Sequence, residues 1–406
     1  MEIVLIRGLN PYFESSASAN RYTSIIDGLI RNGANVTLIV TNGYNNISEF
    51  KLSGIKAPNS NLNIKYTITT FNHNIWLRRI NGYLLSGINA WYSNFKLKRY
   101  FVEQQYDFLW LTNDATILHF FVRNHKKLNY KKSIIELNEF NDIYKQDGHI
   151  SNPKQYKKAK DADETFLKAI DRIDLFAVMT QTLISYYKQL TTNKNAVFFH
   201  LPMTVDLNRF SEVKNSTLFR KPYIAFTGTY TNQKDGVDIL IHAFGRIAND
   251  YPDYHLYLAG FYHWDVTMQK KLIDNYGLAK RITYLNVLDK ETIPGFIQDA
   301  ELLVLSRPDS HQAQGGFPTK LGEYLASGNP VCVTKVGEIP YYLEDNISAF
   351  LAEPGDSASF ADAMQRALSD KKRAEKVGIK GKEVAQIHFN MEIQAKRLME
   401  FLRSNL

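Results

Sequence analysis

The chain contains a single cysteine, no long apolar run and no low-complexity tract. Cys332 lies in the apolar run Pro330–Thr334, which predicts a small buried strand residue, and one cysteine excludes an intrachain disulfide. No stretch reaches the roughly 20 apolar residues that span a bilayer. The opening Met1–Arg7 carries an acid at once and too few apolar residues for a signal peptide. These absences predict a cytoplasmic protein.

Positive charge is concentrated in the first half of the chain. The 406 residues carry a net charge of +8, with 25 basic and 16 acidic residues through Met203 but 24 and 25 afterwards. The length exceeds what one hydrophobic core normally serves and predicts two domains of roughly 200 residues. The basic half predicts an anionic partner, such as a membrane or a lipid-linked phosphate. Because no nucleic-acid motif accompanies the 24 tyrosines and 24 phenylalanines, we expect no nucleic acid.

The first half alternates strand and helix. Ile3–Ile6 and Asn35–Thr41 are candidate strands, and apolar residues at helical spacing lie between them. Asp107–Thr112 and Ser133–Leu137 are two further candidate strands, and Phe198–Asp206 suits a final strand that leads into a hinge. Units of this kind build parallel sheets through right-handed crossovers.

The pattern starts again with a strand at Pro222–Gly228, a polar turn and an amphipathic helix. Four later candidate strands are His255–Ala259, Ile282–Leu285, Leu302–Leu305 and Val331–Thr334. The sequence therefore predicts an α/β fold with two facing Rossmann-like, doubly wound domains, residues 1–205 and 206–388, and a last helix in 389–406 that returns to the first domain. Ligands of such sheets bind at the carboxyl ends of the strands.

The segment Gln314–Val331 carries the most informative pattern. The double-glycine turn Gly315–Gly316 lets a ligand approach the backbone, and Pro318 marks a helix start because its missing N–H would be unpaired there anyway. The amides of Thr319 and Lys320 are then free to bind phosphate at the positive end of the helix dipole.

This segment resembles the donor-binding helix of retaining glycosyltransferase family 4, whose members have the two-domain GT-B fold. The resemblance implies that Glu323 binds the donor ribose hydroxyls. It places Gly315 where the family has a first glutamate, and it assigns Gly316, Phe317, Thr319 and Lys320 to the donor site.

The turn Gly228–Gly236 resembles the family's Gly-Arg-Leu-x-x-x-Lys-Gly motif, with Gly228 as its first glycine. The resemblance places Lys234 at the lysine position, where a cation stabilises charge on the leaving diphosphate without a metal. The family's arginine falls on Thr229. Lys320 or Arg307 can compensate for the missing cation.

In the first domain the resemblance assigns two further places. Ser15 and Ser16 occupy the family's glycine-rich turn and can bind donor phosphate or acceptor hydroxyls; a simple role on the approach to a helix is the alternative. Glu139 follows the strand after which the family has a histidine. It is a candidate acceptor-binding or acid–base carboxylate, or alternatively a loop acid or helix cap.

The resemblance implies a metal-independent retaining glycosyltransferase that moves a hexosyl group from a nucleotide diphosphate sugar. A UDP-sugar is favoured over a GDP-sugar, the acceptor is a glycan or a lipid-linked saccharide, and the implied role is surface polysaccharide biosynthesis. A nucleotide-sugar 2-epimerase shares this architecture and is one alternative. A non-catalytic nucleotide-sugar-binding protein is another, since the arginine, the first glutamate and the histidine of the family are replaced.

No metal or other cofactor is expected. The ten histidines lack the spacing of zinc ligands. Asp161 and Asp163 imitate the Asp-x-Asp metal motif of the other large glycosyltransferase fold, but they lie in a charged stretch with helical spacing and no preceding strand.

The stretch Ile75–Phe101 mixes tryptophan and aliphatic residues with cations. Its basic residues include Arg78, Arg79, Lys96, Lys98 and Arg99. Basic amphipathic stretches with tryptophan lie on anionic membranes, which would make the protein peripheral on the inner face of the cell membrane. An ordinary packed helix with a solvated basic face is the alternative.

Overall fold

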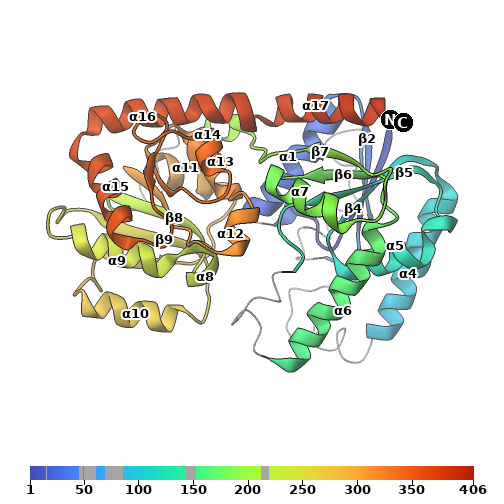
Figure 1. Cartoon of the computed structure of the whole chain (residues 1–406), viewed down its shortest axis with the longest axis horizontal. Helices are drawn as coiled ribbons and strands as arrows, with labels where there is room; N and C mark the ends of the chain where they lie inside the picture. Colours follow the sequence, from blue (N-terminus) through green and yellow to red (C-terminus); the bar gives the residue numbers. More distant parts are fainter. Residues whose placement is uncertain (15, 45–48, 50–60, 69–85, 143–151, 212–218) are drawn as a thin grey trace. The chain divides into compact units, whose positions relative to one another are not determined.

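The structure is a computed structural model, and it describes residues 1–14, 16–44, 49, 61–68, 86–142, 152–211 and 219–406. Ser15, Arg78 and Arg79 from the sequence analysis lie outside these residues. The chain forms two compact units, coloured along the sequence in Figure 1. The first contains Met1–Glu14, Tyr22–Leu201 and Gln394–Leu406, and the second contains Ser15–Arg21 and Pro202–Ile393.

The first unit is built on a parallel sheet with the strand order β3-β2-β1-β4-β5-β6-β7. The strands are β1 Glu2–Arg7, β2 Asn35–Val40, β3 Leu62–Tyr66, β4 Tyr106–Thr112, β5 Tyr130–Leu137, β6 Leu175–Val178 and β7 Val197–His200. β3 and β6 were not predicted from the sequence. The four residues of β6 form a continuous apolar run just after a helix, which periodicity alone does not distinguish from helix.

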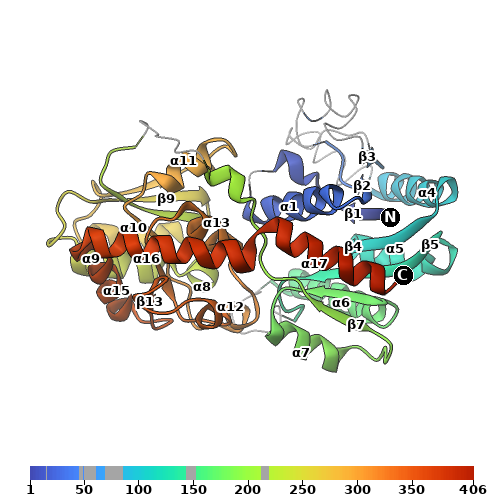
Figure 2. The ribbon, with the colours of Figure 1, turned by 90° about the horizontal axis from the view of Figure 1, so that it is seen from above.

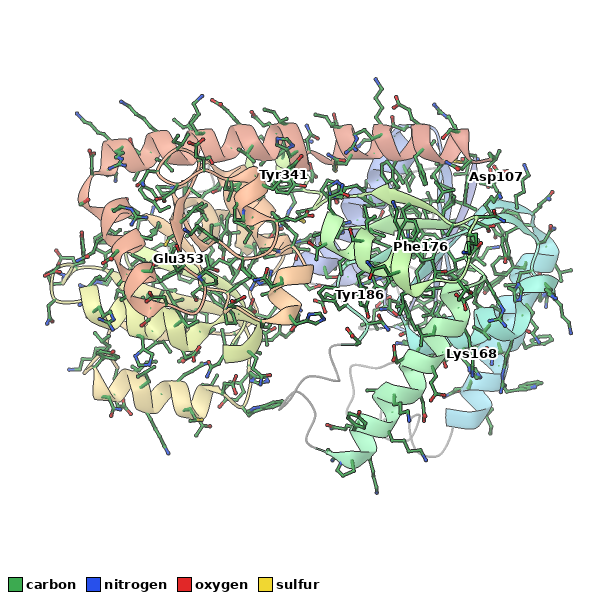
Figure 3. The ribbon with its side chains drawn as sticks, viewed as in Figure 1. Asp107, Lys168, Phe176, Tyr186, Tyr341 and Glu353 are labelled. Carbon is green, nitrogen blue, oxygen red and sulfur yellow. The ribbon has the colours of Figure 1, made fainter. Side chains whose placement is uncertain are left out.

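Helices cover both faces of this sheet. They are α1 Ala17–Arg31, α4 Ser86–Glu103, α5 Ala115–Asn124, α6 Pro153–Ile170, α7 Gln181–Leu190 and α17 Met391–Ser404, with short turns η1 Pro11–Phe13 and η2 His125–Lys127. Side chains of α1 and α17 form one core with the sheet, and those of α4 to α7 form the other. Figure 2 shows α17 running beside α1. In the second core, Phe176 stacks on Phe198 with ring centroids 4.6 Å apart. Phe176 is labelled among the side chains of Figure 3.

The second unit repeats this architecture, with a parallel sheet in the order β10-β9-β8-β11-β12-β13. Its strands are β8 Tyr223–Thr229, β9 His255–Phe261, β10 Ile282–Leu285, β11 Leu302–Leu305, β12 Val331–Thr334 and β13 Phe350–Ala352. Five of these six strands were identified from the sequence; the three-residue β13 was not. The prediction of an α/β fold with two Rossmann-like doubly wound sheets is thus confirmed.

The helices of the second unit also lie on two sides of its sheet: Figure 1 shows α9 and α10 on one side of β8 and β9, and α13 and α16 on the other. The helices are α8 Asn232–Asp235, α9 Val237–Ile247, α10 Val266–Asn275, α11 Thr292–Gln298, α12 His311–Gly315, α13 Thr319–Ser327, α14 Ile339–Tyr342, α15 Ser357–Ser369 and α16 Lys371–Val384, with η4 Leu207–Phe210 and the π-helical turn η5 Ala385–Phe389. Among the described residues, no helix is both long and apolar enough to cross a membrane.

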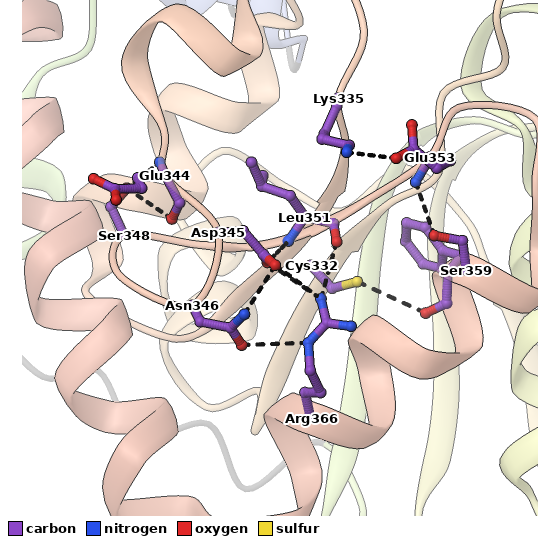
Figure 4. A network of polar contacts seen from close by, with 11 residues as sticks. Cys332, Lys335, Glu344, Asp345, Asn346, Ser348, Leu351, Glu353, Ser359 and Arg366 are labelled. Carbon is purple, nitrogen blue, oxygen red and sulfur yellow. Dashed lines mark hydrogen bonds and ion pairs between the residues drawn. The ribbon is translucent and has the colours of Figure 1, made fainter.

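Cys332 lies on β12 and is fully buried, as predicted. Its Sγ lies 4.0 Å from the carbonyl oxygen of Phe360, and burial raises the pKa of its thiol well above the ordinary value. Close by, the guanidinium of Arg366 donates to Asp345 and to the carbonyl oxygen of Leu351 (Figure 4). The contacts of Arg366 hold α15 against β13. The buried thiol of Cys332 lies against Phe360 of α15, which indicates a structural role.

Candidate active site

The carboxyl end of β8 brings backbone unusually close to a lysine. Gly228 has a φ of 152°, and a Cβ at this position would lie 2.1 Å from Lys320 Nζ. Its partner on β9 is Gly260, where a Cβ would lie 1.7 Å from the carbonyl oxygen of Gly228. A side chain at position 260 would collide with the backbone, and one at position 228 would have to displace the Lys320 ammonium. The first glycine of the predicted motif therefore makes room for a cation at the strand end.

The turn after β8 forms the short helix α8. The Thr231 hydroxyl accepts a hydrogen bond from the Asp235 amide at 3.3 Å, and Gly236 ends the helix in the left-handed conformation with φ 65°. This places Lys234, which is half-buried, and Asp235, which is buried, beside the end of β8. Asp235 Oδ2 also accepts from the Thr229 amide at 3.2 Å, which fixes the carboxylate.

Helix α13 begins at Thr319, with Pro318 at the capping position just before it. No side chain caps this helix end, and the first amides of a helix have no partner within the helix. Phe317 is buried against the rings of Tyr342 and Phe389, at centroid distances of 5.5 and 5.2 Å. The ring therefore anchors the chain immediately before the helix start that the sequence analysis assigned to phosphate.

Lys320 forms a buried ion pair that the sequence analysis did not anticipate. Its Nζ donates to Asp235 Oδ1 at 2.7 Å, and the two side chains are only 12% and 6% exposed. The ammonium also lies over the ring of Phe226, 4.7 Å from the centroid. Burial lowers the pKa of Lys320, although Asp235 opposes this shift. The one sequence signal for Asp235 was its place next to Lys234 in the motif.

The neighbouring side chains on α13 also contact protein groups. The Tyr324 hydroxyl accepts from the Thr227 amide at 2.6 Å, and burial raises the pKa of this phenol. Glu323, 5% exposed at its side chain, forms an ion pair with Arg209 and accepts from Asn20 Nδ2 at 2.9 Å. All of these residues belong to the second unit. The predicted helix face thus presents a charged, buried row beside the end of β8.

Arg307 follows β11 and supports the double-glycine turn. It is 3% exposed, and its Nη1 donates to the carbonyl oxygen of Gly316 at 3.0 Å. Its own carbonyl oxygen accepts from the Thr334 hydroxyl at 2.8 Å. Gly315 is the last residue of α12 and is buried. The arginine thus shapes the turn that precedes Phe317.

Two predicted site residues have structural contacts of their own. The Ser16 hydroxyl accepts from the Ala19 amide at 3.1 Å, a helix-capping contact of the kind considered as the alternative. Glu139, in the first unit, follows β5 and is half-buried, and its carbonyl oxygen accepts from the Tyr187 hydroxyl at 2.6 Å. Whether either residue contacts a substrate stays a prediction.

Within the described part of the chain, no cluster of three His, Cys, Asp or Glu side chains could hold a metal ion. Asp161 and Asp163 lie on α6, where Asp163 is buried and accepts from Asn141 Nδ2. A metal-independent reaction remains an expectation from the sequence.

Residues 221–370 match the protein-family model described as Glycosyl transferases group 1. This segment is similar to group 1 glycosyltransferases. It contains both the β8 turn with Lys234 and Asp235 and the helix with Lys320 and Glu323.

The chain is also similar to individual proteins. It is 24% identical over 220 residues to a GDP-mannose-dependent alpha-(1-6)-phosphatidylinositol monomannoside mannosyltransferase of Mycolicibacterium smegmatis, covering 51% of this chain and 56% of that protein. The chain spans about half the length of the curated relatives that it matches.

Two solved structures share the fold over the whole chain. A sucrose-phosphate synthase from Thermosynechococcus elongatus has a TM-score of 0.74 at 16% identity, covering 100% of this chain and 98% of that one. Anabaena HepE in complex with UDP and glucose has a TM-score of 0.72 at 15% identity, covering 100% of both chains. The chain therefore shares the two-domain GT-B fold of these structures.

Proposed function

We propose that this chain is a retaining glycosyltransferase that transfers a hexosyl group from a nucleotide diphosphate sugar to a glycan or lipid-linked acceptor in surface polysaccharide biosynthesis. The carrying observation is the buried Lys320, held beside Gly228 at the end of β8 within the group 1 domain. Carboxyl ends of parallel strands are where such sheets bind ligands. A cation fixed there stabilises an anionic leaving group.

The local chemistry suits a diphosphate. Lys320 supplies one buried ammonium, Lys234 lies on the adjacent turn, and the uncapped start of α13 adds backbone amides and a favourable dipole. In the proposed reaction these groups take up the charge that develops as the sugar–phosphate bond breaks. The acceptor hydroxyl then attacks from the face that the diphosphate leaves, and a donor phosphate oxygen takes its proton.

The base of the donor nucleotide differs between two of the similar proteins. The mycobacterial relative is named for GDP-mannose, and the Anabaena structure contains UDP and glucose. We favour a UDP-sugar and retain a GDP-sugar as the alternative. Calorimetry with UDP and GDP, followed by mass spectrometry of products from a donor and acceptor panel, decides between them.

A free sugar released from UDP-N-acetylglucosamine alone would indicate the 2-epimerase. Nucleotide binding without turnover on any donor would indicate a binding protein.

The proposed lipid-linked acceptor is supported by the outer face of α4. Ile88, Trp91, Phe95 and Val102 recur at helical spacing and are 64%, 67%, 52% and 81% exposed. The opposite face of the same helix packs into the core of the first unit through Leu97. An exposed apolar stripe of this length on a surface helix marks an interaction site.

The cations on α4 favour an anionic membrane as the partner of this stripe. Lys98 and Arg99 are exposed beside it, and Lys96 lies over the ring of Tyr92 at 5.4 Å. Arg99 is partly neutralised by Glu103 at 2.8 Å. Aromatic rings at the headgroup level together with lysine attraction to anionic lipid suit a peripheral protein on the cytoplasmic face.

A further inference from the structure

The carboxylate of Glu323 is held asymmetrically. Arg209 Nη1 and Asn20 Nδ2 both donate to the same oxygen, Oε1. The other oxygen, Oε2, accepts no hydrogen bond from the described residues. A carboxylate oxygen has two acceptor sites, so an oxygen without a partner is available to a ligand donor.

Arg209 is itself fixed in place. It lies on η4, which begins after Asp206, whose Oδ1 accepts from the Asn208 amide at 3.0 Å. The next residue, Phe210, is 2% exposed, and its carbonyl oxygen accepts from Gln298 Nε2 at 3.2 Å. The backbone on both sides of the arginine is therefore tied down.

The start of this segment also packs directly on α13. A Cβ at Gly322, the residue before Glu323, would lie 2.9 Å from Met203 Cγ. Because Gly322 has no side chain, Met203 and the segment that leads to η4 can pack closely on α13. The Arg209 guanidinium forms an ion pair with Glu323, and the arginine side chain is only 16% exposed.

We propose that Arg209 is a positioning residue that fixes Oε1 of Glu323 and so aims Oε2 at the vicinal hydroxyls of the donor ribose. The inference rests on the proposed function, since it requires a ribonucleotide donor at this site. Arg209 thereby determines selectivity for a ribonucleotide over its deoxy forms.

An arginine at position 209 orients the Glu323 carboxylate better than a lysine would. Its rigid guanidinium presents Nη1 to Oε1 in one direction, whereas a lysine supplies the charge on a flexible stem without that direction. Arg209→Lys should therefore keep the fold and the charge balance but lose part of the ribose selectivity. Arg209→Met should lose most of it.

The test is calorimetric titration of the full chain with UDP and GDP and with their 2′,3′-dideoxy forms. The wild type should bind the better of the two ribonucleotides at least about 10-fold more tightly than its dideoxy form, since hydrogen bonds to a charged group contribute this much. In Arg209→Met the ratio should fall towards 1, with an intermediate ratio in Arg209→Lys. Arg373→Met, on the exposed start of α16, is the matched control and should keep the wild-type ratio.

The outcomes separate the two claims. If neither UDP nor GDP binds to the wild type, the proposed function fails and this inference fails with it. If the ribonucleotide binds but both arginine variants keep the wild-type ratio, the inference alone is overturned. Should Arg209→Met melt below the assay temperature, the ratio measured for Arg209→Lys decides.

Discussion

Lys320 and Asp235 are 85 positions apart in sequence and form a buried ion pair at 2.7 Å, in the space that Gly228 leaves by having no side chain. The pair satisfies the lysine when no ligand is bound, because a lone buried ammonium is costly. Under the proposed function, a donor phosphate has to share Lys320 with Asp235.

Removing either ligand-facing charge should impair catalysis. Glu323→Gln and Lys234→Met should each lower kcat/KM by about 10²-fold, since the loss of one preorganised charge contact commonly has this effect. Steady-state kinetics with the identified donor measures it. Lys380→Met, an exposed lysine on α16 paired with Glu383, is the control and should leave the rate unchanged. Rates near wild type in both site variants would refute the assignment.

A methyl group at position 228 should damage the site more than one at another left-handed glycine. Gly277 has a φ of 67° and open space around its Cβ position, so Gly277→Ala should cost only the backbone term, about 1 kcal/mol of unfolding free energy. Gly228→Ala adds a clash with Lys320 and should cost a further 1–3 kcal/mol or so. Urea unfolding of both variants compares them, and equal losses would contradict the close approach.

The lowered pKa of Lys320 predicts an alkaline limit to activity. Burial depresses the pKa, with smaller contributions from Arg307 and Lys234, while Asp235 opposes them. The ammonium should therefore lose its proton, and kcat/KM should fall, as pH rises through a value below the ordinary 10.5. Arg keeps its charge at these pH values, so in Lys320→Arg the decline should vanish or move to higher pH. A pH profile from 7 to about 10.5 is the measurement; an identical limb in the variant would exclude Lys320 as its source.

The outer face of α4 should bind anionic vesicles. At about 1 kcal/mol per basic residue near an anionic surface, the cations of α4 supply attraction that salt weakens. In liposome flotation, vesicles rich in phosphatidylserine should carry the protein at low salt, and neutral vesicles should not. Lys98→Glu with Arg99→Glu should abolish flotation, and Trp91→Ser with Phe95→Ser should weaken it. Equal flotation with neutral vesicles would indicate that the basic face is simply solvated.

Turnover should not depend on a divalent ion. The proposed charge stabilisation comes from Lys234, Lys320 and the start of α13, so EDTA should leave the initial rate unchanged. Loss of activity on chelation, restored by magnesium or manganese, would show that these groups are insufficient and that a metal shares the diphosphate charge.

The sequence by itself determined most strands of the two sheets and the two turns of the candidate site, after β8 and before α13. Apolar runs flanked by turns specified most strands, because a parallel strand buried on both faces has a nearly continuous apolar sequence. Glycine and proline fixed the turns after β8 and before α13, since these residues restrict backbone geometry locally.

Only the tertiary structure decided how the site side chains are paired. Asp235 lies next to Lys234 in the Gly228–Gly236 turn, but neither Asp235 nor Arg209 shows its partner locally. Their roles come from contacts with Lys320 and Glu323, which are distant in sequence. Likewise, the sequence left open whether the stretch Ile75–Phe101 lies on a membrane or packs as an ordinary helix. The packing of Leu97 and Phe101 decided which face of α4 is buried and which stays exposed. The ion pairs of the site and the buried face of α4 depend on where distant segments meet. Residue type and spacing along one segment do not specify these meeting points.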